Sequence, residues 1–275
     1  MKSEFQYFAC PNCHTTMVVF PSHFECKNCR SSYPINSSIA DFLLVNDKTN
    51  GNTLIKQASR FDDLAEVYGT SQWGGTPKVV IWLLNRKIKN KNGIGLDIAC
   101  GTGQMAIPMA RKMKQVYGVD ISMGMLQKAF KLSQEKDINN ISFARCDSES
   151  LPFGDNSFDF VSCSGALHAF PNAENSMIEM QRVLKQGGIL AVMALLQKNI
   201  PAVIDPTKRK LKKTSNKEQS DTMKFTKAQS TVENLDVKLL HRFTLDELKS
   251  LINKLGFINF KYIKLGPIII FSVKK

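Results

Sequence analysis

The feature that most constrains this chain is a glycine-rich turn between a short apolar run and a helical pattern. Residues 94–99 are typical of a strand, Gly101-Thr102-Gly103 follows as the turn, and a helix is expected over 104–113. Glycines permit a tight turn and the close approach of a ligand to the backbone, and the first turn of a helix offers unpaired N–H groups. Because ligands of open α/β sheets lie at the carboxyl ends of the strands, this stretch predicts an α/β fold with a nucleotide site.

The alternation of short apolar runs and helical patterns continues from about residue 60 to the C-terminus. This alternation is typical of a mainly parallel sheet whose strands are buried on both faces. Further strands are expected over 116–119, 141–144, 158–163 and 189–193, and helices over 76–90, 123–136 and 173–186, the last stopping at Gly187-Gly188.

The C-terminal part of the chain predicts an antiparallel end to this sheet. A capping box formed by Thr244 and Glu247 opens a last helix, which Gly256 ends. Two strands over 257–262 and 268–273 are then joined by a short turn, and a parallel pair would need a long crossover. The expected fold is therefore a seven-stranded α/β sheet, parallel with an antiparallel C-terminal hairpin.

Acidic residues lie at or near the ends of three successive predicted strands. Taken alone, Gly101-x-Gly103-x-x-Ala106 also fits a dinucleotide-binding turn. Asp97 argues against that ligand, because a carboxylate before the turn would repel a pyrophosphate and suits a cationic ligand. Asp120 is placed to accept hydrogen bonds from both hydroxyls of a ribose, and Asp147 from the amino group of an adenine. The alternative is that the three acids merely terminate strands.

Four of the seven cysteines form a second motif. Cys10-x2-Cys13 and Cys26-x2-Cys29, separated by twelve residues, have the spacing of a four-thiolate zinc site with no open position for chemistry. We expect residues 1–45 to form a zinc ribbon that draws its folding energy from the metal. The alternative is a reduced cluster without metal. The polar residues 46–59 are expected to be a linker, and residues 60–275 the main domain.

The composition indicates the cellular compartment and the kinds of binding partner to expect. The scattered cysteines are unlike a secreted disulfide framework, and no apolar run approaches the roughly 20 residues of a membrane span, so a cytoplasmic protein is expected. The net charge of +13 raises the question of nucleic acid. The densest basic segment, 208–227, contains one aromatic residue, Phe225, which gives little support for stacking on bases.

Residues 60–275 resemble a class I methyltransferase dependent on S-adenosylmethionine (SAM), in the branch called type 11. The resemblance rests on 97–103, Asp120, Asp147, and the stretches 151–159 and 182–188, while 60–68 is similar to the segment that caps the cofactor in relatives. Cys100 departs from the small or acidic residue usual at its position. The resemblance implies a Rossmann-like fold and these cofactor-binding residues: Asp97, Gly101, Thr102, Gly103, Asp120, Ile121, Asp147, Ser148, Ser164 and Tyr68.

A ribbon joined to such a domain is similar to ribosomal RNA guanine-N1 methyltransferases and to a set of plastid and bacterial methyltransferases. The expected function is methyl transfer to a small organic acceptor, and the alternative is methylation of ribosomal RNA. A more remote alternative is a SAM-binding adaptor without catalysis. Residues 197–243 are expected to select the acceptor, either as a lid over a small substrate or as a basic RNA contact. His168 is a candidate general base, with a packing role as the alternative.

Overall fold

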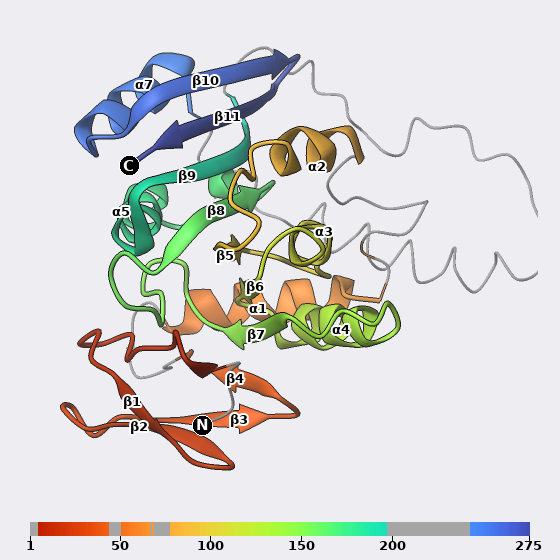
Figure 1. Cartoon of the computed structure of the whole chain (residues 1–275), viewed down its shortest axis with the longest axis vertical. Coiled ribbons are helices and arrows are strands. Elements are labelled where there is room, and N and C mark those ends of the chain that lie inside the picture. The colour runs from red at the N-terminus through yellow and green to blue at the C-terminus, as the bar shows by residue number, and fades with distance from the viewer. Residues whose placement is uncertain (1–4, 44–50, 67, 69–77, 197–242) are drawn as a thin grey trace, which may run out of the picture.

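The computed structural model describes residues 5–43, 51–66, 68, 78–196 and 243–275 (Figure 1). Its strands form one ordered series, β1-β2-β3-β4-β7-β6-β5-β8-β9-β11-β10. The bounds are β1 Met17–Val19, β2 His23–Cys26, β3 Ser32–Asn36, β4 Ile39–Asp41, β5 Ile94–Ile98, β6 Gln115–Asp120, β7 Ile141–Arg145, β8 Phe158–Ser164, β9 Leu184–Leu195, β10 Ile258–Leu265 and β11 Ile268–Lys274.

The seven strands from β5 onward confirm the predicted Rossmann-like sheet. Neighbouring strands are parallel from β7 through β6, β5 and β8 to β9. β11 is antiparallel to both β9 and β10, as the short connection between the last two strands predicted. The carboxyl ends of the five parallel strands therefore meet at one edge of the sheet.

Two clusters of buried apolar side chains fill the two faces of the sheet. Alternation along β9 shows the division, since Leu190 and Val192 belong to one cluster and Ala191 and Met193 to the other. α5 (Ala173–Val183), α7 (Leu245–Lys254) and the N-terminal segment contribute to the first cluster, and α2 (Lys78–Asn85), α3 (Ala106–Ala110) and α4 (Met123–Gln134) to the second. The sheet is thus covered on both faces, as parallel strands require.

The N-terminal segment is part of the main sheet. β4 pairs in parallel with β7, and β3 pairs with β4, so the sheet continues into the cysteine-bearing strands (Figure 1). Phe8, Phe24 and Tyr33 are buried in the same apolar cluster as the interior of β5. The predicted boundary at residue 45 therefore does not separate two independent cores.

The predicted linker over 46–59 is wrong from residue 51 onward. Helix α1 spans Gly51–Leu64, and it packs against α4. Its apolar positions Leu54, Ala58 and Phe61 recur at helical spacing, and this pattern outweighs the polar composition.

The predicted end of the 173–186 helix at Gly187-Gly188 is also wrong. α5 ends at Val183, and Leu184 already pairs with Phe158 of β8. The carbonyl of Val183 accepts from the amide of Ser157, at 2.8 Å, so this carbonyl pairs with the segment that precedes β8 and not with a further helical turn. The helices predicted over 76–90 and 104–113 are present but shorter, as α2 and α3.

The capping box was predicted correctly. Thr244 accepts from the amide of Glu247, and the Glu247 carboxylate accepts from the amide of Thr244. Residues 197–242, nearly all of the predicted acceptor segment, lie outside the described residues. Across the part of the chain that is described, no helix combines the length and apolarity that crossing a membrane demands.

Candidate active site

An open cavity of about 790 Å³ lies at the carboxyl ends of β5, β6, β7 and β8. Seven of the ten predicted cofactor residues line it, namely Tyr68, Gly101, Asp120, Ile121, Asp147, Ser148 and Ser164. Asp97 lines a small adjoining pocket that shares Tyr68, Gly101 and Ser164.

The turn after β5 is held in an unusual backbone conformation. Ala99, Gly101 and Gly103 have positive φ values of 54°, 52° and 79°. Glycine adopts this region freely, whereas alanine at 99 is strained by roughly 1–2 kcal/mol. A Cβ at position 101 would lie 3.7 Å from Cε1 of Tyr68, so the glycine keeps this wall of the cavity low.

Thr102 and Gly103 line neither described pocket at this edge. Thr102 is buried, and the amide of Gly103 donates to the carbonyl of Cys100 at 2.9 Å. The carbonyl of Gly103 accepts from Ile107, which joins the turn to the helix. In the structure these two residues shape the turn.

Asp120 connects the turn to the end of β6. Its Oδ2 accepts from the amide of Gly101 at 2.8 Å, and its Oδ1 from the amide of Ser122 at 3.0 Å. Burial raises the pKa of this carboxyl, although these backbone hydrogen bonds oppose the shift. Each carboxylate oxygen has a further lone pair, so Asp120 can accept from two ligand hydroxyls while holding the turn.

Asp97 is buried and only partly satisfied. Its Oδ1 accepts from the Ser162 hydroxyl at 2.6 Å, whereas its Oδ2 is buried with no hydrogen-bond partner in the structure. Burial raises the pKa of Asp97 to about 7. A buried carboxylate oxygen without a donor is costly, and a bound cationic group would supply the missing donor and favour the ionised form.

Asp147 and Ser148 form the third side of the cavity, immediately after β7. Burial raises the pKa of Asp147, while the amide of Glu149 donates to its Oδ1 at 3.0 Å. The hydroxyl of Ser148 lies 2.9 Å from that of Ser176 on α5. The three predicted acids are thus brought to one edge of the sheet, as their positions after successive strands indicated.

Helix α1 covers the cavity. Leu54, Gln57 and Phe61 line it, and Gln57 donates to the carbonyl of Ala169 at 3.0 Å on the opposite rim. The similarity of 60–68 to a cofactor-capping segment indicated Phe61 and Tyr68. The linker interpretation missed Leu54 and Gln57, although the helical spacing of the apolar residues was a usable signal.

The candidate base His168 does not line the cavity. It lies in a short 3₁₀ turn, Leu167–Ala169, of which Ala169 faces the cavity. Phe170 and Pro171 complete the rim on that side. The structure therefore gives His168 no contact with the space that a ligand would fill.

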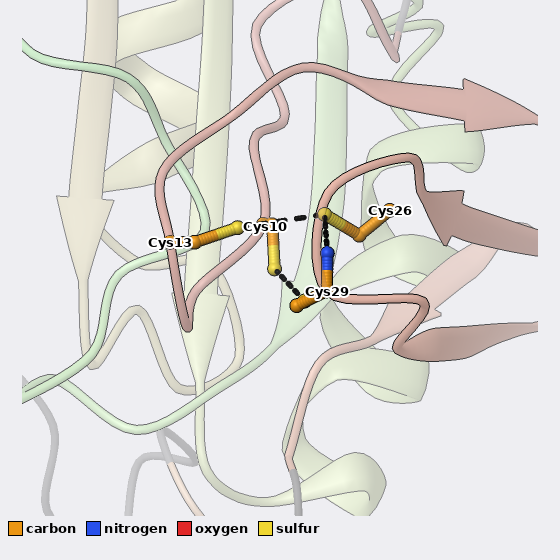
Figure 2. Close-up of side chains that lie close together, drawn as sticks. All are labelled: Cys10, Cys13, Cys26 and Cys29. Carbon is orange, nitrogen blue, oxygen red and sulfur yellow. Dashed lines mark hydrogen bonds between the residues drawn. The ribbon is translucent and has the colours of Figure 1, made fainter.

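The four cysteines form a cluster with the geometry of a metal centre. The sulfurs of Cys10, Cys13, Cys26 and Cys29 all lie within 4.8 Å of one another, and Figure 2 shows the side chains converging from two loops. The Sγ–Sγ distances of Cys10–Cys29 and Cys13–Cys26 are 3.5 Å. A tetrahedron with zinc–sulfur bonds of about 2.3 Å places its sulfurs roughly 3.8 Å apart, so the donor set fits this ion.

Comparison with known proteins agrees with this geometry. Residues 96–192 match the model of the family described as methyltransferase domain (type 11). The methyltransferase YcgJ of Bacillus subtilis is 39% identical over 93 residues, covering 34% of this chain and 37% of YcgJ. A demethylmenaquinone methyltransferase of Listeria monocytogenes is 38% identical over 109 residues, covering 38% of this chain and 46% of the relative. The chain thus spans less than half the length of these curated relatives.

Solved structures show the same fold. The crystal structure of YcgJ matches with a TM-score of 0.53 and 23% identity, covering 68% of this chain and 71% of YcgJ. A phosphoethanolamine N-methyltransferase of Haemonchus contortus, in complex with S-adenosylhomocysteine, matches with a TM-score of 0.56 and 15% identity, covering 86% of this chain and 62% of that one. The fold is that of Rossmann-like methyltransferases. Residues 96–192 are thus similar in sequence to the methyltransferase domain of these relatives.

Proposed function

We propose that this protein transfers a methyl group from SAM to a small organic acceptor. The observation that carries the proposal is Asp97 Oδ2, a buried carboxylate oxygen without a donor, which lies beside the strained turn and lines a small pocket that adjoins the cavity at the strand ends. SAM carries an ammonium group that suits this acceptor, and Asp120 and Asp147 suit its ribose and adenine. The assignment of all ten cofactor residues is part of the proposal.

SAM, when bound, would supply an activated methyl group on a sulfonium. The protein's own residues would hold and orient it, with Asp97 binding the ammonium, Asp120 the ribose hydroxyls and Asp147 the adenine amino group. Gln57 and Phe61 of α1 would exclude water from the side of the cavity that this helix covers. Alignment and water exclusion are the main requirements of an in-line displacement with a good leaving group, so the proposal assigns no general base.

A small organic acceptor is favoured by the character of the cavity. Leu54, Phe61, Phe170 and Pro171 give its rim an apolar lining. Demethylmenaquinone methyltransferases are among the relatives, and their name denotes a small-molecule substrate. We propose that the four cysteines bind a structural zinc ion and that the protein acts in the cytoplasm, which agrees with seven cysteines of which none forms a disulfide.

Methylation of ribosomal RNA is the second candidate. The net charge of +13 favours it, because cationic side chains bind the phosphate backbone. The cysteine cluster also favours it, because a ribbon joined to such a domain is similar to ribosomal RNA guanine-N1 methyltransferases. A SAM-binding adaptor without catalysis is more remote.

The test is to incubate the zinc-loaded protein with methyl-labelled SAM and cell extract, and to count label in the RNA and small-molecule fractions. We expect label among small molecules, and much less label with an Asp120→Ala variant at the same SAM concentration. Label in RNA would replace the acceptor proposal with the second candidate. SAM binding without label in any fraction would favour the adaptor.

A further inference from the structure

The cysteine cluster lies against the loop that carries Asp147, which we call the adenine-side loop and define as residues 146–153. If SAM binds as proposed above, on which this inference rests, the position of this loop affects SAM affinity. We propose that the metal-bound knuckle 10–13 positions the adenine-side loop, so that zinc and SAM each strengthen the binding of the other.

The N-terminal segment holds both ends of the loop through backbone hydrogen bonds. Before the loop, the amide of Phe42 donates to the carbonyl of Arg145 at 2.8 Å, next to the β4–β7 pairing. After Asp147, the amide of Ala9 donates to the carbonyl of Pro152 at 2.9 Å. Such bonds fix the distance between the segment and the loop and leave little freedom for either to move alone.

One side chain joins the knuckle to the middle of the loop. The hydroxyl of Ser150 donates to the carbonyl of Pro11, at 3.0 Å, and Pro11 lies between Cys10 and Cys13. The amide of Ser150 donates to the carbonyl of Asp147 at 3.2 Å. A displacement of the knuckle is thus transmitted to Asp147 through a single turn of chain.

Aromatic packing reinforces this junction. Phe8, two residues before Cys10, stacks on Phe153 with ring centroids 5.2 Å apart, and both rings are buried. Phe8 also contacts Phe24, which lies two residues before Cys26. Each cysteine pair therefore begins next to an aromatic cluster that includes the end of the adenine-side loop.

The opposite side of the loop rests on α5. The amide of Leu151 donates to Glu179 Oε2 at 2.8 Å, and Ser148 contacts Ser176. The loop therefore contacts α5 on one side and the knuckle on the other. The rigidity of the knuckle depends on how the four sulfurs are held. Metal–thiolate bonds would fix that second wall, since such a short segment gains its order from the metal.

The experiment compares two serine variants of the full-length, zinc-loaded protein. Ser150→Ala removes the bond to Pro11, and we expect it to raise the Kd for SAM about 2- to 10-fold, the effect of one net hydrogen bond. Ser157→Ala is the matched control, because its hydroxyl donates to the carbonyl of Gly154 at 2.7 Å and, within the described part of the chain, forms no hydrogen bond with the knuckle. Isothermal titration calorimetry should find the Kd of this control within about 2-fold of the unmodified protein.

A second measurement separates positioning from a general loss of stability. Because coupling is reciprocal, saturating SAM should tighten zinc binding, measured by competition with a chromophoric chelator, by about 5-fold or more. Ser150→Ala should reduce this factor, and Ser157→Ala should preserve it.

Each negative result has a distinct meaning. Equal zinc affinity with and without SAM, in a protein that binds SAM, would overturn the inference and leave the proposed function intact. Equal weakening by the two serine variants would also overturn it. Failure of the unmodified protein to bind SAM would instead overturn the proposed function.

Discussion

At the residue scale, the candidate site consists of carboxylates whose environments differ. Asp97 is buried with one oxygen unpaired, whereas both oxygens of Asp120 already accept backbone amides. The first carboxylate gains a donor from a ligand, and the second holds the turn in shape and adds ligand contacts. Substitutions of the two therefore have different expected consequences.

Replacing Asp120 by alanine should weaken SAM binding by about 10- to 100-fold, because hydrogen bonds to a charged group contribute roughly 1.5–3 kcal/mol. Calorimetric titration with SAM measures the change. The exposed Asp246→Ala controls for the loss of one negative charge, and thermal melting separates lost contacts from lost folding. Unchanged affinity in Asp120→Ala would make the ribose assignment wrong.

The raised pKa of Asp97 predicts a pH dependence for SAM binding. Its folded-state pKa of about 7 lies above the ordinary 3.8, so the carboxyl is increasingly protonated as pH falls below 7. A cationic ligand prefers the ionised form, and SAM affinity should fall from pH 8 to pH 6. Ionising the buried Asp97 carboxyl is unfavourable in the folded state. Without ligand, the contribution of Asp97 to the free energy of unfolding should therefore fall as pH rises from about 4 to 7.

Titrations across pH 5.5–8.5 check this expectation, with Asp97→Asn as the comparison. The variant should bind SAM more weakly and lose the slope in this range. A slope that persists in the variant would assign the titration to another group.

At the scale of elements, the position of α1 over the cavity depends on contacts with α4. Asp62 Oδ1 accepts from the amide of Gly124 at 2.7 Å and from the hydroxyl of Ser122 at 2.5 Å, at the N-terminus of α4. Lys128 of α4 donates in return to the carbonyls of Ala65 and Glu66, both at 2.7 Å. Each helix thus places a charge where the other leaves backbone groups unpaired.

Asp62→Ala should release α1 from α4 and raise the Kd for SAM about 10-fold, because a charge-assisted contact that holds the cover is lost. Asp63→Ala is the matched control, since this adjacent acid on the same helix is also exposed but, within the described part of the chain, forms no hydrogen bond with α4. Calorimetry and limited proteolysis of α1 provide the two measurements. Equal effects of the two variants would contradict this role for Asp62.

At the scale of the whole molecule, the cysteine-bearing segment and the α/β domain share one sheet and one apolar cluster. The sequence predicted a zinc ribbon over residues 1–45, a linker, and a main domain over 60–275. The β4–β7 pairing and the buried aromatic residues favour a cooperative unit instead.

Removing zinc should therefore lower the main thermal unfolding transition, rather than produce a separate early transition of residues 1–45. The physical reason is that the first 43 residues bury aromatic side chains against the sheet. Differential scanning calorimetry before and after chelation measures this. An unshifted main transition beside a new one at low temperature would restore the independent ribbon.

The sequence by itself determined the order of the strands along the chain, the glycine-rich turn, the three acids and the cysteine pairs. Each of these depends on features that are local in the sequence. They are the periodicity of apolar residues, glycines that can adopt a left-handed backbone conformation, and the spacing of the cysteines. Of the seven predicted cofactor residues that line the cavity, all but Tyr68 lie at or just after the ends of parallel strands, which meet at one edge.

Only the tertiary structure decided how these parts contact one another. The helical spacing of apolar residues could have indicated a helix over 51–59, but only its packing against α4 places that helix over the cavity. Leu184 leaves the helix because β8 offers it a ladder partner. The contact between Pro11 and Ser150 joins residues 139 positions apart, and no local pattern encodes it. Local patterns specify elements, whereas contacts between distant elements depend on burial and hydrogen bonding in the folded molecule.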